Sequence, residues 1–401
     1  MRPRVLVVAS DLPWPLESGG KIASYRMIEG IARHHAVDLV SLADIDGPAE
    51  TGALADLCES IEVVRVPFTF RRHRARQLAI AARAALTPTP YRLAKFRSAA
   101  AEAAVARARR TRRPDLVHFE QLGVAPYRRP GLPATLCHHN IETNLYRLGA
   151  RRAGDPVRRG WAALEAAKLA RVEPRSCARF DHVFALTEAD RGWLGRRGIG
   201  PSSVVSLGGA IEPLAAPTPP PPRPTLLTLG TMSWFGVEEG ILWLAREIWP
   251  EVRRLVPAAT WDLAGAHGGP AVRALDGRDG IHVRGRLEDV GAAFASARVV
   301  AVPLAIAGGM RLKIVDALSA GRPVVATALG AAGFESGGGQ GVLAADDPAG
   351  FAGHVASLMT DDALWRSTAK RGLDHVRAVH APDLTAAHIA DVFGRLIGPN
   401  R

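Results

Sequence analysis

The sequence has few cysteines and no long hydrophobic run. Its three cysteines, Cys58, Cys137 and Cys177, show no metal-ligand spacing, and an odd number cannot all pair. We expect them to be buried thiols in a reducing compartment. No window approaches the roughly 18 uninterrupted apolar residues of a membrane-spanning helix, and the apolar run 5–9 is too short for the core of a signal peptide. The sequence therefore predicts a cytoplasmic protein, with peripheral membrane contact left open.

Motifs of several other enzyme classes are missing or isolated. No G-x-G-x-x-G follows the first expected strand, which disfavours a dinucleotide-dependent dehydrogenase. No paired-carboxylate motif of a glycoside hydrolase is visible. Asp44-Ile45-Asp46 has the spacing of a metal-binding D-x-D motif. Two aspartates in a polar loop after a strand are usually solvated, however, and nothing else in the chain supports the fold that carries this motif. We therefore predict no metal site.

Length and charge suggest two domains and an anionic partner. At 401 residues the chain is long for one domain, so two domains of roughly 200 residues are expected. The formal net charge of +12 suits a sugar nucleotide, a nucleic acid or an acidic membrane, although arginine-rich usage also follows from genome composition. Nucleic acid is disfavoured because aromatic residues are sparse and no recognisable binding module is present.

Residues 70–113 form a strongly basic stretch, with thirteen Arg and Lys against one acid, Glu102. The stretch is alanine-rich and helical by propensity, with a break at Pro88 and Pro90. Its arginines precede an apolar turn at 78–80, a pattern that suits an anionic bilayer surface or a lipid-linked acceptor. A soluble acidic acceptor and a plain solvated helix face are the other two interpretations, and the sequence leaves all three open.

The chain is organised around the stretch from Val302 to Phe334, which is expected to form a strand, a glycine loop, a helix, a strand and a second glycine loop. Loop glycines let the backbone approach a ligand closely, and the amino-terminal amides of a helix carry partial positive charge. Together with two cations, these features are what a diphosphate needs. A carboxylate on the same helix could hold a ribose diol. The residues that supply these features are Gly308, Gly309, Arg311, Lys313 and Asp316.

Residues 311–317 (RLKIVDA) and 320–327 (AGRPVVAT) resemble the donor-binding segment of GT-B glycosyltransferases, in particular the retaining family 4 of glycosyl transferases group 1. That family usually has two glutamates eight positions apart, whereas Gly308 and Asp316 occupy these positions here. The departures are expected to leave donor binding intact and to affect sugar-specific contacts. The resemblance implies an α/β fold of the GT-B type, with two facing Rossmann-like doubly wound domains and an inter-domain cleft.

The resemblance also implies the site residues. Arg311 and Lys313 are expected to neutralise the diphosphate, which a metal does in other enzymes, and His139 is expected to face the donor sugar. These three are the predicted catalytic residues. The predicted donor-binding residues are Gly19, Gly20, Gly230, Thr231, Met232, Gly285, Arg286, Leu287, Gly308, Gly309, Met310 and Asp316.

Acceptor binding is predicted in the N-terminal half, at Trp14, Glu120 and Asn140. Glu120 stands at the carboxyl end of an expected strand, where ligands of open α/β sheets gather. His139-Asn140 matches a histidine-asparagine pair of the resembling family. No residue pattern in these loops identifies the acceptor itself.

The predicted domains are residues 1–207, joined by a C-terminal helix 382–401, and residues 225–381, with a proline-rich linker at 208–224. The prediction is a retaining glycosyltransferase that moves a sugar from a nucleoside-diphosphate sugar to an acceptor hydroxyl without metal or other cofactor. Two alternatives stay open: a catalytically degenerate GT-B partner protein, and a GT-B sugar-nucleotide epimerase.

Overall fold

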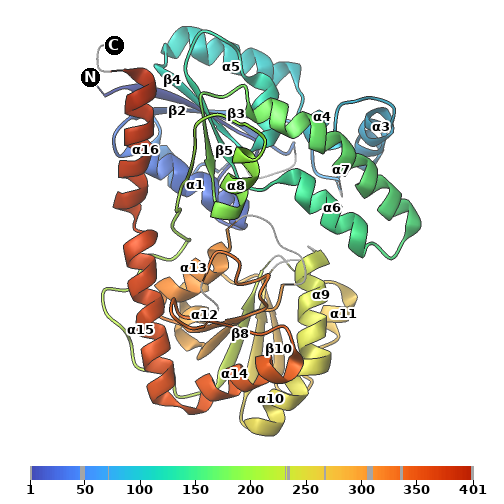
Figure 1. The fold of residues 1–401 in the computed structure, drawn as a ribbon, viewed down its shortest axis with the longest axis vertical. Coiled ribbons are helices and arrows are strands. Elements are labelled where there is room, and N and C mark those ends of the chain that lie inside the picture. Colours follow the sequence, from blue (N-terminus) through green and yellow to red (C-terminus); the bar gives the residue numbers. More distant parts are fainter. Residues whose placement is uncertain are drawn as a thin grey trace. The chain divides into compact units, whose positions relative to one another are not determined.

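The chain forms two compact α/β units in the computed structural model (Figure 1). The structure describes residues 2–45, 50–70, 72–230, 232, 235–265, 268–304, 310–334 and 337–398. Unit 1 comprises Met1–Leu207 and Pro382–Arg401, and unit 2 comprises Gly208–Ala381. The C-terminal helix therefore returns to the unit in which the chain begins.

Unit 1 is built on a parallel sheet of seven strands in the order β3-β2-β1-β4-β5-β6-β7. Its central strands are continuous apolar runs because helices cover both faces of such a sheet. The order reverses between β1 and β4, which is where doubly wound sheets bind ligands. The strands are β1 Arg4–Ala9, β2 Ala36–Ala43, β3 Ser60–Arg65, β4 Leu116–Glu120, β5 Ala134–His138, β6 His182–Ala185 and β7 Ser202–Val204.

The helices of unit 1 connect these strands. Ser18 begins the first of them by accepting a hydrogen bond on Oγ from the Lys21 amide. The last one packs beside it, with the rings of His35 and Phe393 5.3 Å apart. The helices are α1 Gly19–Ala32, α2 Leu54–Leu57, α3 Arg74–Ala85, α4 Tyr91–Ala94, α5 Ala99–Arg112, a 3-10 turn at Leu122–Tyr127, α6 Glu142–Arg152, α7 Pro156–Cys177, α8 Glu188–Gly195 and α16 Pro382–Ile397.

A carboxylate from a neighbouring helix caps α6. Its own N-cap, Ile141, has no side chain that can accept a hydrogen bond. Glu173 of α7 takes this role, accepting from the Glu142 amide at 2.7 Å and the Thr143 amide at 2.9 Å. The same carboxylate lies 2.9 Å from Nε2 of His138, at the end of β5. The α6–α7 hairpin is thus tied to the carboxyl edge of the sheet.

Unit 2 has a second parallel sheet, in the order β10-β9-β8-β11-β12-β13, which reverses between β8 and β11. Its core includes the rings of Trp249 and Trp261, whose centres are 5.5 Å apart and whose planes are tilted by 47°. The strands are β8 Thr225–Leu229, β9 Thr260–Ala264, β10 Ile281–Gly285, β11 Val299–Val302, β12 Val324–Ala326 and β13 Val342–Ala344. The helices are α9 Phe235–Trp243, a π-helical turn Leu244–Ile248, α10 Trp249–Leu255, α11 Pro270–Arg273, α12 Val290–Ser296, α13 Leu312–Ser319, α14 Pro348–Thr360 and α15 Asp362–Val379.

The two doubly wound sheets confirm the α/β fold class predicted from the sequence. The proline-rich stretch 208–224, expected as a linker, lies within unit 2. Leu214 donates its amide to Ser319 O at 2.9 Å, and Pro221 O accepts from Arg298 Nη1 at 3.1 Å. Backbone hydrogen bonds and a buried arginine hold this segment against the second sheet.

Candidate active site

Three glycine turns stack at the carboxyl edge of the second sheet. The Gly230 amide donates to Ala264 O at 3.1 Å, and the Gly265 amide donates to Gly285 O at 2.7 Å. A Cβ on Gly265 would lie 1.7 Å from Gly230 O, and its φ of +148° also favours glycine. The turns after β8, β9 and β10 therefore approach one another more closely than side chains would allow.

Lys313 reaches this stack from the first turn of α13. Its Nζ donates to Leu229 O at 2.9 Å, and a Cβ on Gly230 would lie only 2.8 Å from Nζ. Burial and the positive charge of Arg311 lower the pKa of Lys313 to about 8. Among the described residues, no carboxylate forms an ion pair with Lys313. Its ammonium is thus held at a glycine turn, next to a second cation, without a negative partner in the described part of the chain.

Arg311 stands directly before α13 and is almost completely buried. Its Nη2 donates to Leu329 O at 3.3 Å, in the turn that follows β12. Arg311 and Lys313 thus bring two positive charges to the amino-terminal end of one helix, as the sequence predicted. Such a concentration of buried positive charge is complementary to a phosphate group.

Asp316, predicted to hold the ribose, is buried one turn further along α13. Its Oδ1 accepts a hydrogen bond from the Ile211 amide at 2.8 Å, and a Cβ on Gly209 would lie 2.1 Å from the same atom. The shorter aspartate side chain thus packs closely against the backbone of residues 209–211. Its role toward a ribose stays a prediction.

The other predicted donor-binding residues of unit 2 differ in exposure. Arg286 is exposed, whereas Leu287 is partly buried against the core of unit 2. Met232 is buried, and Met310 is half-buried. Gly285 has a φ of +66°, at the end of β10. Three further predicted residues, Thr231, Gly308 and Gly309, lie outside the described part of the chain.

In unit 1, His139 is held by Glu120. The Glu120 carboxylate is completely buried, and its Oε2 lies 2.7 Å from His139 Nε2. Ser24 donates to the same oxygen at 2.8 Å, and His118 Nε2 lies 2.7 Å from Oε1. Burial alone would raise the pKa of Glu120, but hydrogen bonds and the charges of His118 and His139 outweigh it and lower the pKa. The ionised carboxylate holds a proton of His139 on Nε2, and in the neutral form of the ring this leaves Nδ1 as an acceptor.

One possible metal-ligand set, Glu120, Cys137 and His139, has its ligand atoms within 4.8 Å of one another. Both Glu120 oxygens already accept hydrogen bonds from the protein. Burial and the Glu120 charge raise the pKa of the Cys137 thiol well above its ordinary value. A protonated thiol is a poor metal ligand, so we interpret this cluster as the support of His139.

The remaining predicted residues of unit 1 lie around the loop that follows β1. The Trp14 ring is 6.0 Å from the Tyr25 ring, and Trp14 O accepts from Lys21 Nζ at 3.4 Å. A Cβ on Gly19 would meet no atom within 4 Å, and one on Gly20 would lie 3.4 Å from Gln121 Nε2. Asn140, which follows His139, is half-buried. The glycines thus leave the amino-terminal end of α1 open, as a phosphate or sugar contact would require.

Sequence reasoning missed two charged residues at the same edge of the sheet. Asp11 follows β1, and burial, opposed chiefly by Lys21, raises its pKa to about 6. Lys95 follows α4, and burial together with the charge of Arg92 lowers its pKa to about 7. Its Nζ lies 4.6 Å from the centre of the Phe96 ring. Asp11 could have been recognised by its place directly after a buried strand, whereas Lys95 reaches this edge only through the tertiary fold.

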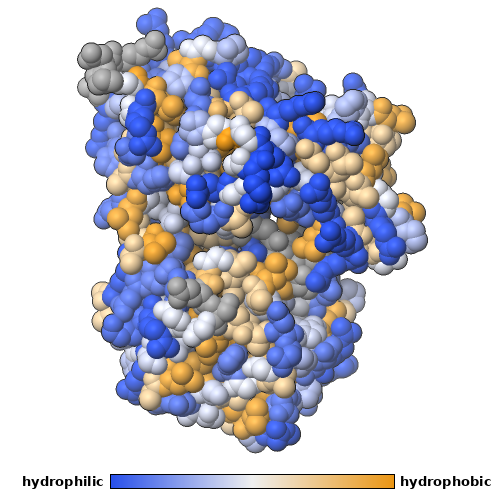
Figure 2. All heavy atoms as spheres, in the orientation of Figure 1, coloured by the Kyte–Doolittle hydropathy of each residue, from blue (hydrophilic) through white to orange (hydrophobic). Residues whose placement is uncertain are grey.

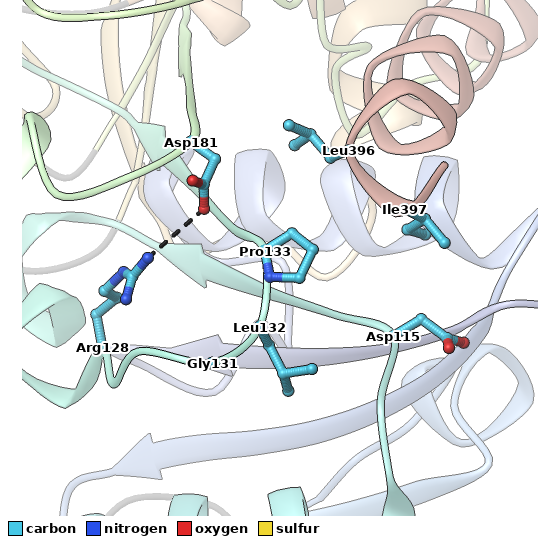
Figure 3. A pocket seen from close by; sticks show the side chains of 8 residues that line it. All are labelled: Asp115, Arg128, Gly131, Leu132, Pro133, Asp181, Leu396 and Ile397. Atoms are coloured by element: carbon cyan, nitrogen blue, oxygen red, sulfur yellow. Dashed lines mark ion pairs between the residues drawn. The ribbon is translucent and has the colours of Figure 1, made fainter. Parts of the chain in front are cut away.

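A cavity of about 560 Å³ lies at the opposite edge of the first sheet (Figure 3). Asp115, Pro133 and Asp181, which line it, each precede a strand. In Figure 3 the Arg128 side chain points toward Asp181, with a nitrogen–oxygen distance of 3.6 Å. None of the predicted site residues lines this cavity, so we do not assign the predicted chemistry to it.

Comparison with known proteins connects these features to a family. Residues 223–361 match the sequence model of the family described as "Glycosyl transferases group 1", whereas no curated protein matches the sequence. Sucrose-phosphate synthase from Thermosynechococcus elongatus is similar in fold, with a TM-score of 0.72 at 17% identity over 98% of this chain and 99% of that one. HepE from Anabaena, solved with UDP and glucose, has a TM-score of 0.65 at 14% identity over 98% and 99% of the two chains.

WaaG, a glycosyltransferase involved in lipopolysaccharide biosynthesis, has a TM-score of 0.61 at 16% identity over 97% of this chain and 99% of that one. Identities this low establish a shared fold, and the family match adds the class of enzyme. Residues 223–361 of unit 2 therefore match glycosyl transferases group 1, and the chain as a whole has the GT-B fold of its solved structural neighbours.

Proposed function

We propose that the protein transfers a sugar from a nucleoside-diphosphate sugar to the hydroxyl of an acceptor, with retention of the anomeric configuration and without a metal ion. Unit 2 binds the nucleotide, and Arg311 and Lys313 stabilise the negative charge that develops on the diphosphate as the glycosidic bond breaks. HepE, which shares the fold, was solved with UDP-glucose, so UDP is the first nucleotide to test.

The observation that carries this proposal is the position of Lys313. Burying an ammonium without a carboxylate is unfavourable, and its lowered pKa is the sign of that cost. Binding a diphosphate at this point would supply the missing negative charge. The neighbouring glycine turns would let the phosphate oxygens approach the backbone as well.

Retention of the anomeric configuration and independence from a metal ion rest on different observations. Two fixed cations at α13 can neutralise the leaving diphosphate, which is the task of a divalent metal in other transferases. Retention follows from the resemblance of residues 311–327 to the retaining family. In unit 1, the backbone carbonyl and Nδ1 of His139 are the groups that we expect to accept a hydrogen bond from a sugar or acceptor hydroxyl.

A nucleotide panel tests the binding step. UDP, GDP, ADP and TDP are added to the wild-type protein, to Lys313→Ala and to the control Lys370→Ala, with and without a chelator. Lys370 is exposed on α15 of unit 2 and pairs with Asp374 at 2.6 Å. One nucleotide is expected to raise the melting temperature regardless of chelator. Loss of a charged hydrogen bond worth about 1.5–3 kcal/mol should weaken its binding by roughly 10- to 150-fold in Lys313→Ala alone.

Turnover separates the proposal from its alternatives. Transfer to an added acceptor, with the anomeric configuration of the product read by NMR, supports a retaining transferase, and an inverted product would contradict retention. Turnover of the nucleotide sugar without any acceptor would favour an epimerase or hydrolase. Tight nucleotide binding with no turnover on any acceptor would favour a degenerate partner protein. Unimpaired nucleotide binding by Lys313→Ala would overturn the phosphate assignment.

A further inference from the structure

Helix α3 turns a polar side chain inward and apolar side chains outward. Only Gln77 and Ala84 of its twelve residues are buried. Gln77 Nε2 donates to Pro67 O at 2.7 Å, and Gln77 Oε1 accepts from Tyr91 Oη at 2.7 Å. Leu78 is 57% exposed, and Leu86, the C-cap residue of α3, is 88% exposed. This reverses the usual arrangement of a surface helix, which buries its apolar stripe.

The outward apolar stripe has helical spacing. Ala75, Leu78, Ala79, Ala82 and Leu86 are all exposed, and their positions i, i+3, i+4, i+7 and i+11 place them along one side of α3. Arg74 and Arg83 are exposed on the same helix. Neither arginine forms an ion pair with another described residue. The helix thus presents leucines and arginines together to the outside.

Helix α7 continues this face. Lys168 Nζ donates a hydrogen bond to Ala84 O, which joins α7 to the end of α3. Val157, Trp161 and Leu164 precede Lys168 on the same stripe of α7, at spacings of four, three and four residues. Val157 is 80% exposed and Leu164 is 39% exposed. Exposed apolar side chains therefore stand on both of the helices that this hydrogen bond joins.

The hairpin tip is also basic. Residues 151–160 (RRAGDPVRRG) carry four arginines and one aspartate, and all but Ala153 are exposed. In Figure 2, hydrophilic and hydrophobic residues are interspersed over α6 and α7. Val157 is flanked by the exposed Arg158 and Arg159. Positive charges around exposed apolar side chains are complementary to a surface with negative headgroups over an apolar interior.

We propose that Leu78, Leu86, Val157 and Leu164, with Arg74, Arg83 and the arginines of the hairpin tip, form a face that binds an anionic lipid bilayer; we call it the α3–α7 face. The arginines contact the lipid headgroups, and the apolar side chains enter the boundary between headgroups and acyl chains. Within the described part of the chain, no helix is both long and apolar enough to cross a membrane. The proposed contact is made by the surface of unit 1 and places that unit at the membrane.

Vesicle flotation with the full-length protein tests this inference. Vesicles of phosphatidylcholine alone are compared with vesicles that contain phosphatidylglycerol, at low and high salt. The apolar variant is Leu78→Ser with Leu86→Ser, and its control is Leu384→Ser, a leucine of α16 that is 52% exposed. The charge variant is Arg74→Glu with Arg83→Glu. Its control is Lys370→Glu with Arg395→Glu, on exposed surfaces of α15 and α16.

We expect wild-type protein to bind the anionic vesicles at least tenfold more strongly than the neutral ones, with binding weakened by salt. Both α3–α7 variants should lose this binding by about tenfold, whereas both controls should keep it. Absence of vesicle binding, equal binding to neutral vesicles, or equal losses in the controls would overturn the proposal. A dimer in light scattering that Leu78→Ser with Leu86→Ser abolishes would also overturn it, since a second copy would then cover this face.

Melting temperature and nucleotide affinity are measured on the same variants. Both are expected to stay within the range of the controls, because the substituted side chains are exposed and lie in unit 1. Failure of vesicle binding with intact nucleotide binding would contradict this inference alone. Failure of nucleotide binding in the wild-type protein would contradict the proposed function and leave the vesicle result to stand separately.

Discussion

The carboxylate of Glu120 lies 2.7 Å from Nε2 of His139 and is completely buried. Both residues stand at or directly after the carboxyl end of a parallel strand, where ligands gather, and the binding role of each stays a prediction. Glu120 is occupied by His118, His139 and Ser24. We infer that Glu120 acts through His139, as a positioning residue.

Replacing Glu120 with Gln should therefore impair turnover while sparing nucleotide affinity. The neutral amide no longer stabilises the Nε2-protonated tautomer of His139, so kcat is expected to fall by about 10- to 100-fold, the equivalent of one charged hydrogen bond. The Kd for the nucleotide should stay within about twofold, because Lys313 and Arg311 belong to unit 2. Glu188→Gln, at an exposed side chain of α8, is the control. An unchanged kcat would show that the tautomer of His139 does not matter.

Nucleotide-sugar binding should weaken as the pH rises from 7 to 9. The diphosphate prefers the protonated form of Lys313, whose pKa is about 8 in the free protein and rises when an anion binds. Affinity is therefore full below this pKa and falls by up to about tenfold per pH unit above it. Calorimetric titration at several pH values measures the effect. Lys313→Arg is the matched variant, because a guanidinium keeps its charge throughout this range; a pH profile equal to that of wild type would contradict the assignment.

Gly230→Ala should weaken nucleotide binding without unfolding the protein. The new Cβ would lie 2.8 Å from Nζ of Lys313, and the flexible lysine can move away from it. We expect a loss of affinity of roughly tenfold, corresponding to about 1.4 kcal/mol, with little change in melting temperature. Gly353→Ala is the control, since its Cβ would meet nothing within 4 Å on helix α14 and alanine favours a helix. Normal nucleotide affinity in Gly230→Ala would contradict this prediction, because it would show that the turn accommodates a Cβ without displacing Lys313.

Glu173→Ala should destabilise unit 1. It removes the carboxylate that caps α6 and leaves His138 buried without a carboxylate partner. Together these losses should lower the free energy of unfolding by about 3 kcal/mol or more. Denaturant unfolding measures this change, and Glu188→Ala on exposed α8 is the control. A loss below about 1 kcal/mol would show that the cap is dispensable.

The contact between Glu173 and His138 also predicts how the stability of unit 1 depends on pH. Burial opposes ionisation of Glu173, but hydrogen bonds with His138 and Thr143 prevail and lower its pKa below the ordinary 4.5. Its contribution is thus present above pH 4.5 and lost as the pH falls through the lowered value. The pKa of His138 is raised above 6.5 because the contacts with Cys177 and Glu173 prevail over burial, so its contribution is present below pH 6.5 and lost as the pH rises through the raised value. A melting temperature that does not fall on acidification would contradict this.

Much of the fold and of the unit 2 site could be predicted from local sequence. The apolar strands, the glycine turns and the run 311–327 are contiguous in sequence. Their spacing alone places Lys313 and Asp316 on one short helix and Arg311 directly before it. The C-terminal helix was predicted to join the first unit, and α16 packs on α1 in the structure.

The contacts between distant residues could not be predicted in this way. No spacing links Lys95 with Asp11, or Glu173 with Glu142 at the start of α6. These pairs are 84 and 31 residues apart and meet only when the strands assemble. The basic segment 70–113 is a similar case. Its composition shows a helix rich in arginine, but a hydrophobic pattern cannot tell which stripe of the helix is buried.

The sequence by itself determined the elements, their order and the residues that can neutralise a diphosphate, since these depend on local backbone preferences and side-chain chemistry. Only the tertiary structure decided which polar groups are buried together, that Glu120 supports His139, and that α3 faces outward with its leucines. Burial and electrostatics depend on every neighbour in space, and those neighbours come from segments that the sequence keeps far apart.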